Sequence, residues 1–274
     1  MDEITAEYAV ADLLPPAELK VLAHVKVGAK TDLGRVRENN EDKFEFYIPD
    51  DELVLASRGQ IFVVCDGMGG HAAGQIASEL ACKTFIDVYL SHPGSDPKEA
   101  LGTAIHAANR WVFLTSRANT ARRDMGTTLS ALVLLQEKAY IVQVGDSRVY
   151  RLRDGELTQI TEDHTFVNEL VRLGTISPED AINHPKKNVI TRAVGVEENV
   201  VPDFFEFDIV EGDVYFLCSD GVMNHVDDAG IHSILSTNGP ASAAWKMVGQ
   251  ALLGGGSDNT TAMVLHVERL EVRD

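Results

Sequence analysis

The chain reads IFVVCDGMGG from Ile61 to Gly70. Five apolar residues are followed directly by Asp66, and three glycines surround Met68. A short apolar run rich in β-branched residues is typical of a strand that is buried on both faces. An acidic residue at the end of such a strand, next to glycines that allow close backbone approach, indicates either a tight turn or a ligand site.

Acidic residues also stand at the ends of four other predicted strands. Asp146 and Asp220 each follow an apolar run, whereas Asp42 and Asp258 each come just before one. In antiparallel sheets the end of one strand lies beside the start of its neighbour, so these residues and Asp66 are expected to converge. Clustered carboxylates raise one another's pKa unless a cation holds them. Oxygen ligands without His or Cys ligand spacing suit Mg²⁺ or Mn²⁺ rather than Zn²⁺.

Hydrophobic patterning elsewhere in the chain predicts an α+β fold. Helical spacing covers residues 72–89, a segment that starts after Pro97, and residues 241–252. Asp154-Gly155 predicts a hairpin turn. Predicted strands cover residues 43–48, 61–65, 129–135, 140–144, 149–152, 157–160, 214–218 and 261–267. Strands that come as hairpins, with helices in blocks between them, favour antiparallel sheets covered by helices.

Composition restricts the possible partners. The 274 residues include 42 Asp and Glu against 24 Lys and Arg, a formal net charge of −18. So acidic a chain argues against binding to nucleic acid or to an anionic membrane, and is compatible with cation binding. The three cysteines are odd in number and lack CxxC spacing, which is typical of a reduced, cytoplasmic protein. No apolar stretch is long enough to cross a membrane.

Arg37 is the candidate phosphate ligand. It lies five residues before Asp42, and an Arg beside a metal site is a suitable bidentate clamp for a phosphoryl group. A surface ion pair with Glu38 or Glu41 is the alternative, and the sequence leaves both open. The chain has neither a P-loop motif nor a Cys followed six residues later by Arg, which excludes P-loop nucleotidases and cysteine phosphatases.

Seven segments together resemble one known family. They are TDLGRVRENNEDKF (31–44), FVVCDGMGGHAAGQIAS (62–78), MGTTLSALVL (125–134), VGDSRVYRLRDGELTQITEDHT (144–165), VITRAVG (189–195), FLCSDGV (216–222) and GGSDNTTAMVLHV (255–267). In their order they resemble the metal-dependent Ser/Thr protein phosphatases of the 2C type, in the bacterial form. The resemblance covers residues from about 25 to 267.

The resemblance implies a specific fold. This fold is an α-β-β-α sandwich of two antiparallel sheets, each covered by a pair of antiparallel helices, with metals at one edge. A flap at about residues 162–195 lies beside the metal site, and Ser177–Asp180 has the pattern of a short helix start. We expect an acidic N-terminal tail at residues 1–20 and one phosphatase domain at residues 21–274.

The resemblance also implies roles for site residues. Asp66 would bridge two metal ions, and three further ligands would complete the pair: the Gly67 carbonyl, Asp220 and Asp258. Glu41 and Asp42 would lie near it, partly through water. Asp146 would hold a weaker third ion together with Asp220, and Arg37 would bind the phosphate.

The position of the histidine after Asp-Gly differs from that in animal and plant members of the family. Those members have His directly after Asp-Gly, where this chain has Met68. His71 follows three residues later, as in bacterial members. A general-acid role for His71 and a place at the start of the helix without a catalytic role both stay open.

The implied activity is hydrolysis of phosphoserine and phosphothreonine on proteins. A hydroxide shared by two Mn²⁺ or Mg²⁺ ions would attack phosphorus in line, in one step. The enzyme would act as a monomer on phosphoproteins and reverse a cognate Ser/Thr kinase. Two alternatives are a regulatory phosphatase of a partner-switching system and a pseudophosphatase that binds phosphoproteins. Retention of Asp66, Asp220, Asp258 and Arg37 argues against the pseudophosphatase.

Overall fold

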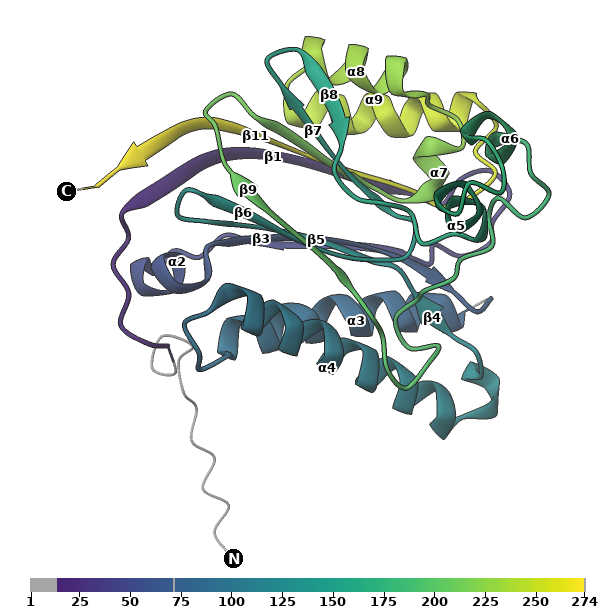
Figure 1. Cartoon of the computed structure of the whole chain (residues 1–274), viewed down its shortest axis with the longest axis horizontal. Coiled ribbons are helices and arrows are strands. Elements are labelled where there is room, and N and C mark those ends of the chain that lie inside the picture. Colours follow the sequence, from purple (N-terminus) through teal and green to yellow (C-terminus); the bar gives the residue numbers. More distant parts are fainter. Residues whose placement is uncertain (1–13, 71, 274) are drawn as a thin grey trace, which may run out of the picture.

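Two antiparallel β-sheets are stacked face to face, and helices cover the outer face of each (Figure 1). The computed structural model describes residues 14–70 and 72–273. The first sheet has the order β1 (Val21–Asp32), β11 (Thr260–Val272), β10 (Val214–Cys218), β7 (Arg148–Arg153) and β8 (Glu156–Gln159). The second has the order β2 (Asp42–Tyr47), β3 (Gln60–Met68), β5 (Leu129–Leu135), β6 (Lys138–Val144) and β9 (Asp203–Asp208), and β4 (Gly126–Thr127) pairs with β3. This arrangement is the predicted α-β-β-α sandwich.

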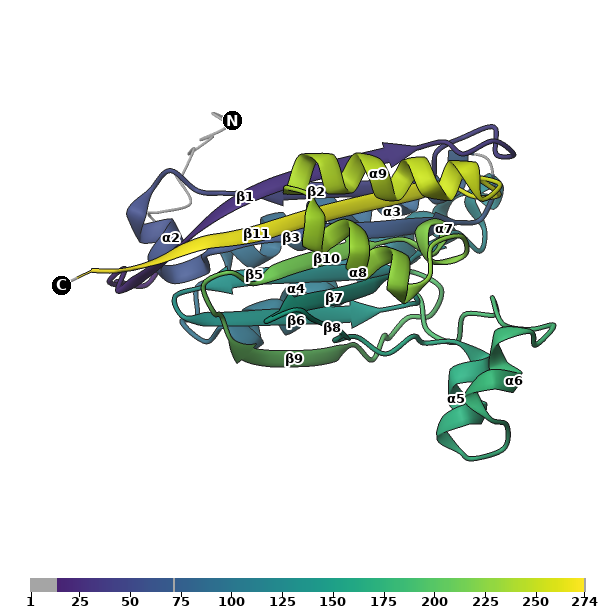
Figure 2. The ribbon, with the colours of Figure 1, turned by 90° about the horizontal axis from the view of Figure 1, so that it is seen from above.

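Each sheet is covered by a pair of long helices. Helices α3 (Ala72–Ser91) and α4 (Pro97–Ala118) lie under the β2–β9 sheet, and α8 (Asp228–Thr237) and α9 (Pro240–Leu253) lie over the β1–β8 sheet. Figure 2 shows α8 and α9 side by side, with α5 (Phe166–Arg172) and α6 (Pro178–Ile182) projecting from one end. The shorter elements are α2 (Glu52–Arg58), the 3₁₀ turn Thr120–Arg122 and α7 (Asp220–Met223).

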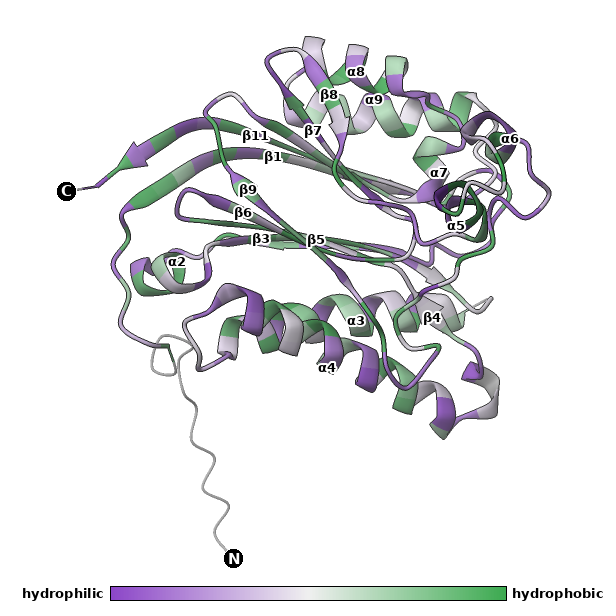
Figure 3. Ribbon diagram, in the orientation of Figure 1, coloured by the Kyte–Doolittle hydropathy of each residue, from purple (hydrophilic) through white to green (hydrophobic). Residues whose placement is uncertain are grey.

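Strand β3 explains why the layers stack in this order. Ile61, Val63 and Cys65 pack into the apolar cluster between this sheet and helices α3 and α4, whereas Phe62 and Val64 face the other sheet. All five side chains are fully buried, so the strand contributes to two cores at once. Figure 3 shows hydrophobic colouring along β3 and β5, whereas α4 alternates between hydrophobic and hydrophilic residues.

Most predicted elements are confirmed, with boundary shifts of a few residues. The Asp154-Gly155 turn joins β7 to β8 with φ angles of 51° and 79°, and Ser177 caps α6 with a capping box. No prediction covered strands β1, β4 and β9 or helices α2, α5, α7 and α8, although Ala23, Val25, Val27 and Ala29 alternate clearly in β1.

Cys65, Cys82 and Cys218 are all buried and free. Within residues 14–70 and 72–273, none of the helices has the length and apolar character needed to cross a membrane.

Part of the predicted N-terminal tail packs against the domain. Residues 1–13 lie outside the described residues. Leu14 is buried in the core beneath the β2–β9 sheet. Gln136, in the turn between β5 and β6, accepts hydrogen bonds from the backbone of Lys20 and Val21 and donates to the carbonyl of Glu18. Residues 14–20 therefore form part of the folded surface, and the division at residue 20 stays a prediction.

Candidate metal centre

The five predicted acidic residues converge at one end of the sandwich. Asp42 pairs directly with Asp66 across β2 and β3. The Asp66 carboxyl interacts electrostatically with those of Asp42, Asp220, Asp146 and Asp258. The five residues come from both sheets. Strand β10 ends, and strand β11 begins, at the end of the sandwich where β3 also ends. The convergence expected from the strand ends is therefore confirmed.

Proton affinities at this cluster are strongly perturbed. Burial, followed by the neighbouring carboxylates, raises the pKa of Asp66 well above its usual range. Burial also raises the pKa of Asp42 to about 7 and that of Asp146 to about 7. The pKa of Asp220 is raised as well, first by burial and then by the charge of Asp258. Carboxylates forced together in this way favour protons or cations as counter-charges.

Asp42 joins the two sheets and leaves one oxygen without a partner. Its Oδ2 accepts hydrogen bonds from the hydroxyls of Ser219 and Thr261, both at 2.7 Å. Its Oδ1 is buried and has no hydrogen-bond partner. An unsatisfied buried carboxylate oxygen is costly, and a water molecule or a cation would satisfy it.

Gly67 and Glu41 lie against each other so closely that no side chain fits at residue 67. The Gly67 N–H donates to the Glu41 carbonyl at 3.1 Å. A Cβ on Gly67 would lie 2.2 Å from the Gly74 carbonyl oxygen and 2.5 Å from that of Glu41. Asn259 fixes the same loop, since it accepts from the Glu41 N–H at 2.8 Å. Asn259 was not among the predicted site residues, although it directly follows Asp258.

Arg37 pairs with a predicted metal ligand. Its Nη2 donates to Asp258 Oδ2 at 2.7 Å, and half of its side chain is exposed. The hydrogen bond to Asp258 is the main cause that raises the pKa of Arg37. The hydrogen-bonded partner is thus neither Glu38 nor Glu41, and the guanidinium lies at the acidic cluster. His71 lies outside the described residues, so its role as a general acid stays a prediction.

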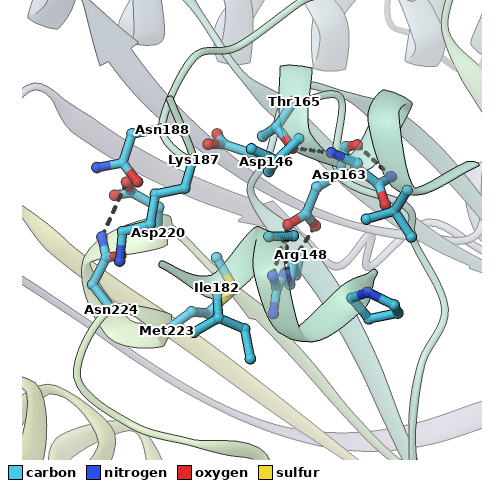
Figure 4. A pocket seen from close by; sticks show the side chains of 15 residues that line it. Asp146, Arg148, Asp163, Thr165, Ile182, Lys187, Asn188, Asp220, Met223 and Asn224 are labelled. Atoms are coloured by element: carbon cyan, nitrogen blue, oxygen red, sulfur yellow. Dashed lines mark hydrogen bonds and ion pairs between the residues drawn. The ribbon is translucent and has the colours of Figure 1, made fainter. Parts of the chain in front are cut away.

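A pocket of about 400 Å³ opens beside Asp146 and Asp220 (Figure 4). Its other walls come from α5 and α6 of the flap and from Met223 on α7. Lys187 and Ile182 line it. The remaining lining residues are Arg148, Asp163, Thr165, Val167, Asn168, Val171, Pro178, Ala181, Asn188 and Asn224. The flap thus forms one side of a cavity that ends at the acidic cluster.

Arg148 and Asp163 form an ion pair in this pocket that the sequence analysis missed. Arg148 Nε and Nη2 contact the Asp163 carboxylate at 2.8 and 2.7 Å. Bidentate geometry of this kind fixes both side chains. Both residues lie in the quoted segment 144–165, which is the signal that would have drawn attention to them.

Carboxylates of the acidic cluster are held by contacts with other protein groups. Among the residues that the structure describes, no group of three or more His, Cys, Asp and Glu side chains already has the arrangement of a metal site. Arg37 holds Asp258, and Asn224 donates to Asp220 Oδ2 at 3.2 Å. The donor atoms nevertheless fit Mg²⁺ or Mn²⁺, because all of them are carboxylate or carbonyl oxygens. The unsatisfied Asp42 Oδ1 also favours a bound cation or water molecule.

Comparison with known proteins identifies the family. The family model described as Protein phosphatase 2C matches residues 35–244. The chain belongs to the protein phosphatase 2C family. It is 40% identical over 245 residues to the serine/threonine phosphatase stp of Listeria monocytogenes serotype 4b, which covers 88% of this chain and 94% of that protein.

Mycobacterial relatives extend the comparison. The chain is 38% identical over 248 residues to the serine/threonine protein phosphatase PstP of Mycobacterium tuberculosis strain H37Rv, with 90% of this chain covered. It spans only 46% of that longer protein. The solved catalytic domain of PstP in complex with two manganese ions superposes with a TM-score of 0.77 at 37% identity, and covers 91% of this chain and 100% of that one. Family members of this type are metal-dependent protein phosphatases.

Proposed function

We propose that this chain hydrolyses phosphoserine and phosphothreonine on proteins. The observation that carries the proposal is the acidic cluster around Asp66, with its raised pKa values, at the end of the flap pocket. A site of this kind gathers cations beside a cavity that can receive a peptide. Family membership and the stp and PstP relatives support the same activity.

Divalent cations would bind to the carboxylates of Asp66, Asp220 and Asp258 and to the Gly67 carbonyl. Glu41 and Asp42 would contact them partly through water. A weaker third ion would lie between Asp146 and Asp220. When bound, Mn²⁺ or Mg²⁺ lowers the pKa of bound water and neutralises charge on the phosphoryl group.

The chain's own residues would bind and orient the substrate. Arg37 is half exposed and would exchange its Asp258 contact for two phosphoryl oxygens. The flap pocket would hold residues that neighbour the phosphorylated one. His71 would donate a proton to the leaving oxygen.

The cellular setting follows as part of the same proposal. A monomeric, cytoplasmic, bacterial phosphatase would oppose a cognate Ser/Thr kinase in signal transduction. Neither a nucleic-acid nor a membrane partner is expected, given the net charge of −18.

Substrate selectivity tests the proposal. Matched peptides with phosphothreonine, phosphoserine or phosphotyrosine are incubated with the protein and Mn²⁺, and phosphate release is measured. We expect release from the first two peptides and much slower release from the third. Tight binding of the phosphothreonine peptide with no release would support the pseudophosphatase alternative instead.

A further inference from the structure

His164 is a buried histidine at the base of the flap, outside the set of proposed metal and phosphate ligands. It is 3% exposed. Its ring lies between the turn that carries Asp146 and the strand β9. A buried polar ring needs hydrogen-bond partners for its nitrogens, and these partners show which segments the ring connects.

Each ring nitrogen of His164 has a distinct partner. The Gly145 N–H donates to Nδ1 at 3.1 Å, so Nδ1 carries no proton. The proton therefore lies on Nε2, which faces Asp203 Oδ2 at 3.0 Å. Arg192 Nη1 also lies 3.2 Å from Nε2, and it donates to the other oxygen of Asp203 at the shorter distance of 2.9 Å. Burial lowers the pKa of His164, and the nearby Arg192 charge adds to this, which agrees with a neutral ring.

Backbone hydrogen bonds attach His164 to the same turn and to both ends of the flap. The His164 N–H donates to the Gly145 carbonyl at 2.9 Å. The His164 carbonyl accepts from the Thr191 N–H at 2.8 Å, and Thr165 pairs with Ile190. One residue thus joins the entrance of the flap, its exit and the Gly145 turn.

Residues of the β-sheet also hold the Gly145 turn. Gly145 has a φ of 102°, and an added Cβ would lie 2.5 Å from the Thr128 side chain. Gln143 Nε2 donates to the Gly145 carbonyl at 3.1 Å. Asp146, the next residue, is buried and interacts with Asp220. Contacts from the sheet and from His164 therefore restrain the backbone that carries Asp146.

We propose that His164 is a positioning residue, whose Nδ1 holds the Gly145–Asp146 turn so that Asp146 stays directed towards Asp220. The proposal rests on the proposed function, because Asp146 matters there as a ligand of the third ion. The ring thereby links the base of the flap to the Asp146 carboxylate through one hydrogen bond, which the Gly145 N–H donates to Nδ1.

Two amide variants distinguish the hydrogen bond at Nδ1 from the hydrogen bond at Nε2. In His164→Asn the amide oxygen lies near the Nδ1 position and still accepts from Gly145. In His164→Gln the amide nitrogen lies near the Nε2 position, so it still donates to Asp203 but leaves Gly145 without an acceptor. A role that is only structural would affect the two variants equally.

Hydrogen exchange of the Gly145 amide is the primary measurement, made on the full chain without metal or substrate. We expect exchange to be about fivefold faster in His164→Gln than in the wild type, the change that corresponds to one ordinary hydrogen bond. His164→Asn should stay within about twofold. In the activity assay, His164→Gln should also need about fivefold more Mn²⁺ for half-activation, with the phosphopeptide KM unchanged.

Equal exchange rates in the two variants, or equal Mn²⁺ requirements, would overturn the positioning role. If His164→Gln does not fold, Asp203→Ala, which removes the acceptor of Nε2, replaces it. That carboxylate is one-third exposed, and its loss removes the charged partner of Nε2. Faster Gly145 exchange would then support the proposal, and unchanged exchange would overturn it. A wild type that is inactive on phosphopeptides would contradict the proposed function, whereas the exchange data test His164 alone.

Discussion

Arg37 and Asp258 lie 221 positions apart in the chain and form an ion pair of 2.7 Å at the rim of the acidic cluster. The pair gives Asp258 a positive partner while no cation is bound. It also places the guanidinium beside the site where a phosphoryl group would arrive. Metal binding at Asp258 and phosphate binding at Arg37 are therefore expected to favour each other, since each frees the other from the ion pair.

Removal of the Arg37 guanidinium should weaken phosphopeptide binding more than metal binding. One charge-assisted bidentate contact contributes about 1.5–3 kcal/mol, so Arg37→Ala should raise the KM about tenfold or more. Arg35→Ala, at an exposed position in the same loop, is the matched control. A kcat/KM within about twofold of the wild type would show that Arg37 is not the phosphate ligand.

Stability of the metal-free protein should fall as the pH rises. The folded-state pKa values of Asp42 and Asp146 are both about 7, compared with about 4 in an unfolded chain. Groups with raised pKa stabilise the fold below the unfolded value, and this contribution is lost as the pH rises through the folded value. The window lies between about pH 4 and pH 7.

Thermal unfolding with and without Mn²⁺ measures this effect. The lowered pKa of His164 acts in the opposite direction, but it is common to both conditions. We therefore expect the rise in Tm that Mn²⁺ causes to be larger at about pH 8 than at about pH 5.5. An equal rise at both values would contradict the assignment of these carboxylates as cation ligands.

Loss of the Asp146 carboxylate should affect only a weak metal site. Asp146 and Asp220 are the two protein carboxylates expected at the third ion, and a site with few protein ligands keeps most of its waters and binds weakly. Titration of activity with Mn²⁺ should show a tight and a weak activating phase in the wild type. Asp146→Ala should lose the weak phase alone, and Glu156→Ala, at an exposed position, should keep both.

Two other outcomes of that titration would contradict this view. Loss of the tight phase in Asp146→Ala would place Asp146 in the metal pair. Full activity in the variant would make it a turn residue.

The sequence predicted the acidic cluster because its signal is local. Each of Asp66, Asp146 and Asp220 follows a buried apolar run, and the direction of antiparallel strands brings their ends together. The hairpin at Asp154 and the cap at Ser177 were predictable for the same reason, since turn and cap chemistry depends on neighbouring residues.

Contacts between distant loops were not predictable. The partner of Arg37 depends on how the loop before β2 meets the loop before β11, and from the sequence a surface ion pair with Glu38 or Glu41 was as plausible as a phosphate clamp. The contacts of His164 with Gly145 and Asp203 likewise depend on where the flap leaves the sheet. Such contacts follow from tertiary structure, which residue spacing does not specify.

Metal-dependent turnover of a phosphothreonine peptide tests the central claim most directly. The wild type, Asp66→Asn and the exposed control Asp87→Asn on α3 are assayed for phosphate release with Mn²⁺, after exhaustive chelation, and after Mn²⁺ is restored. A neutral amide cannot replace a carboxylate shared by two cations. We predict that chelation stops the wild type and the control reversibly, and that folded Asp66→Asn stays inactive with a metal-free Tm that holds or rises. Undiminished turnover without metal, or in Asp66→Asn, would contradict the account.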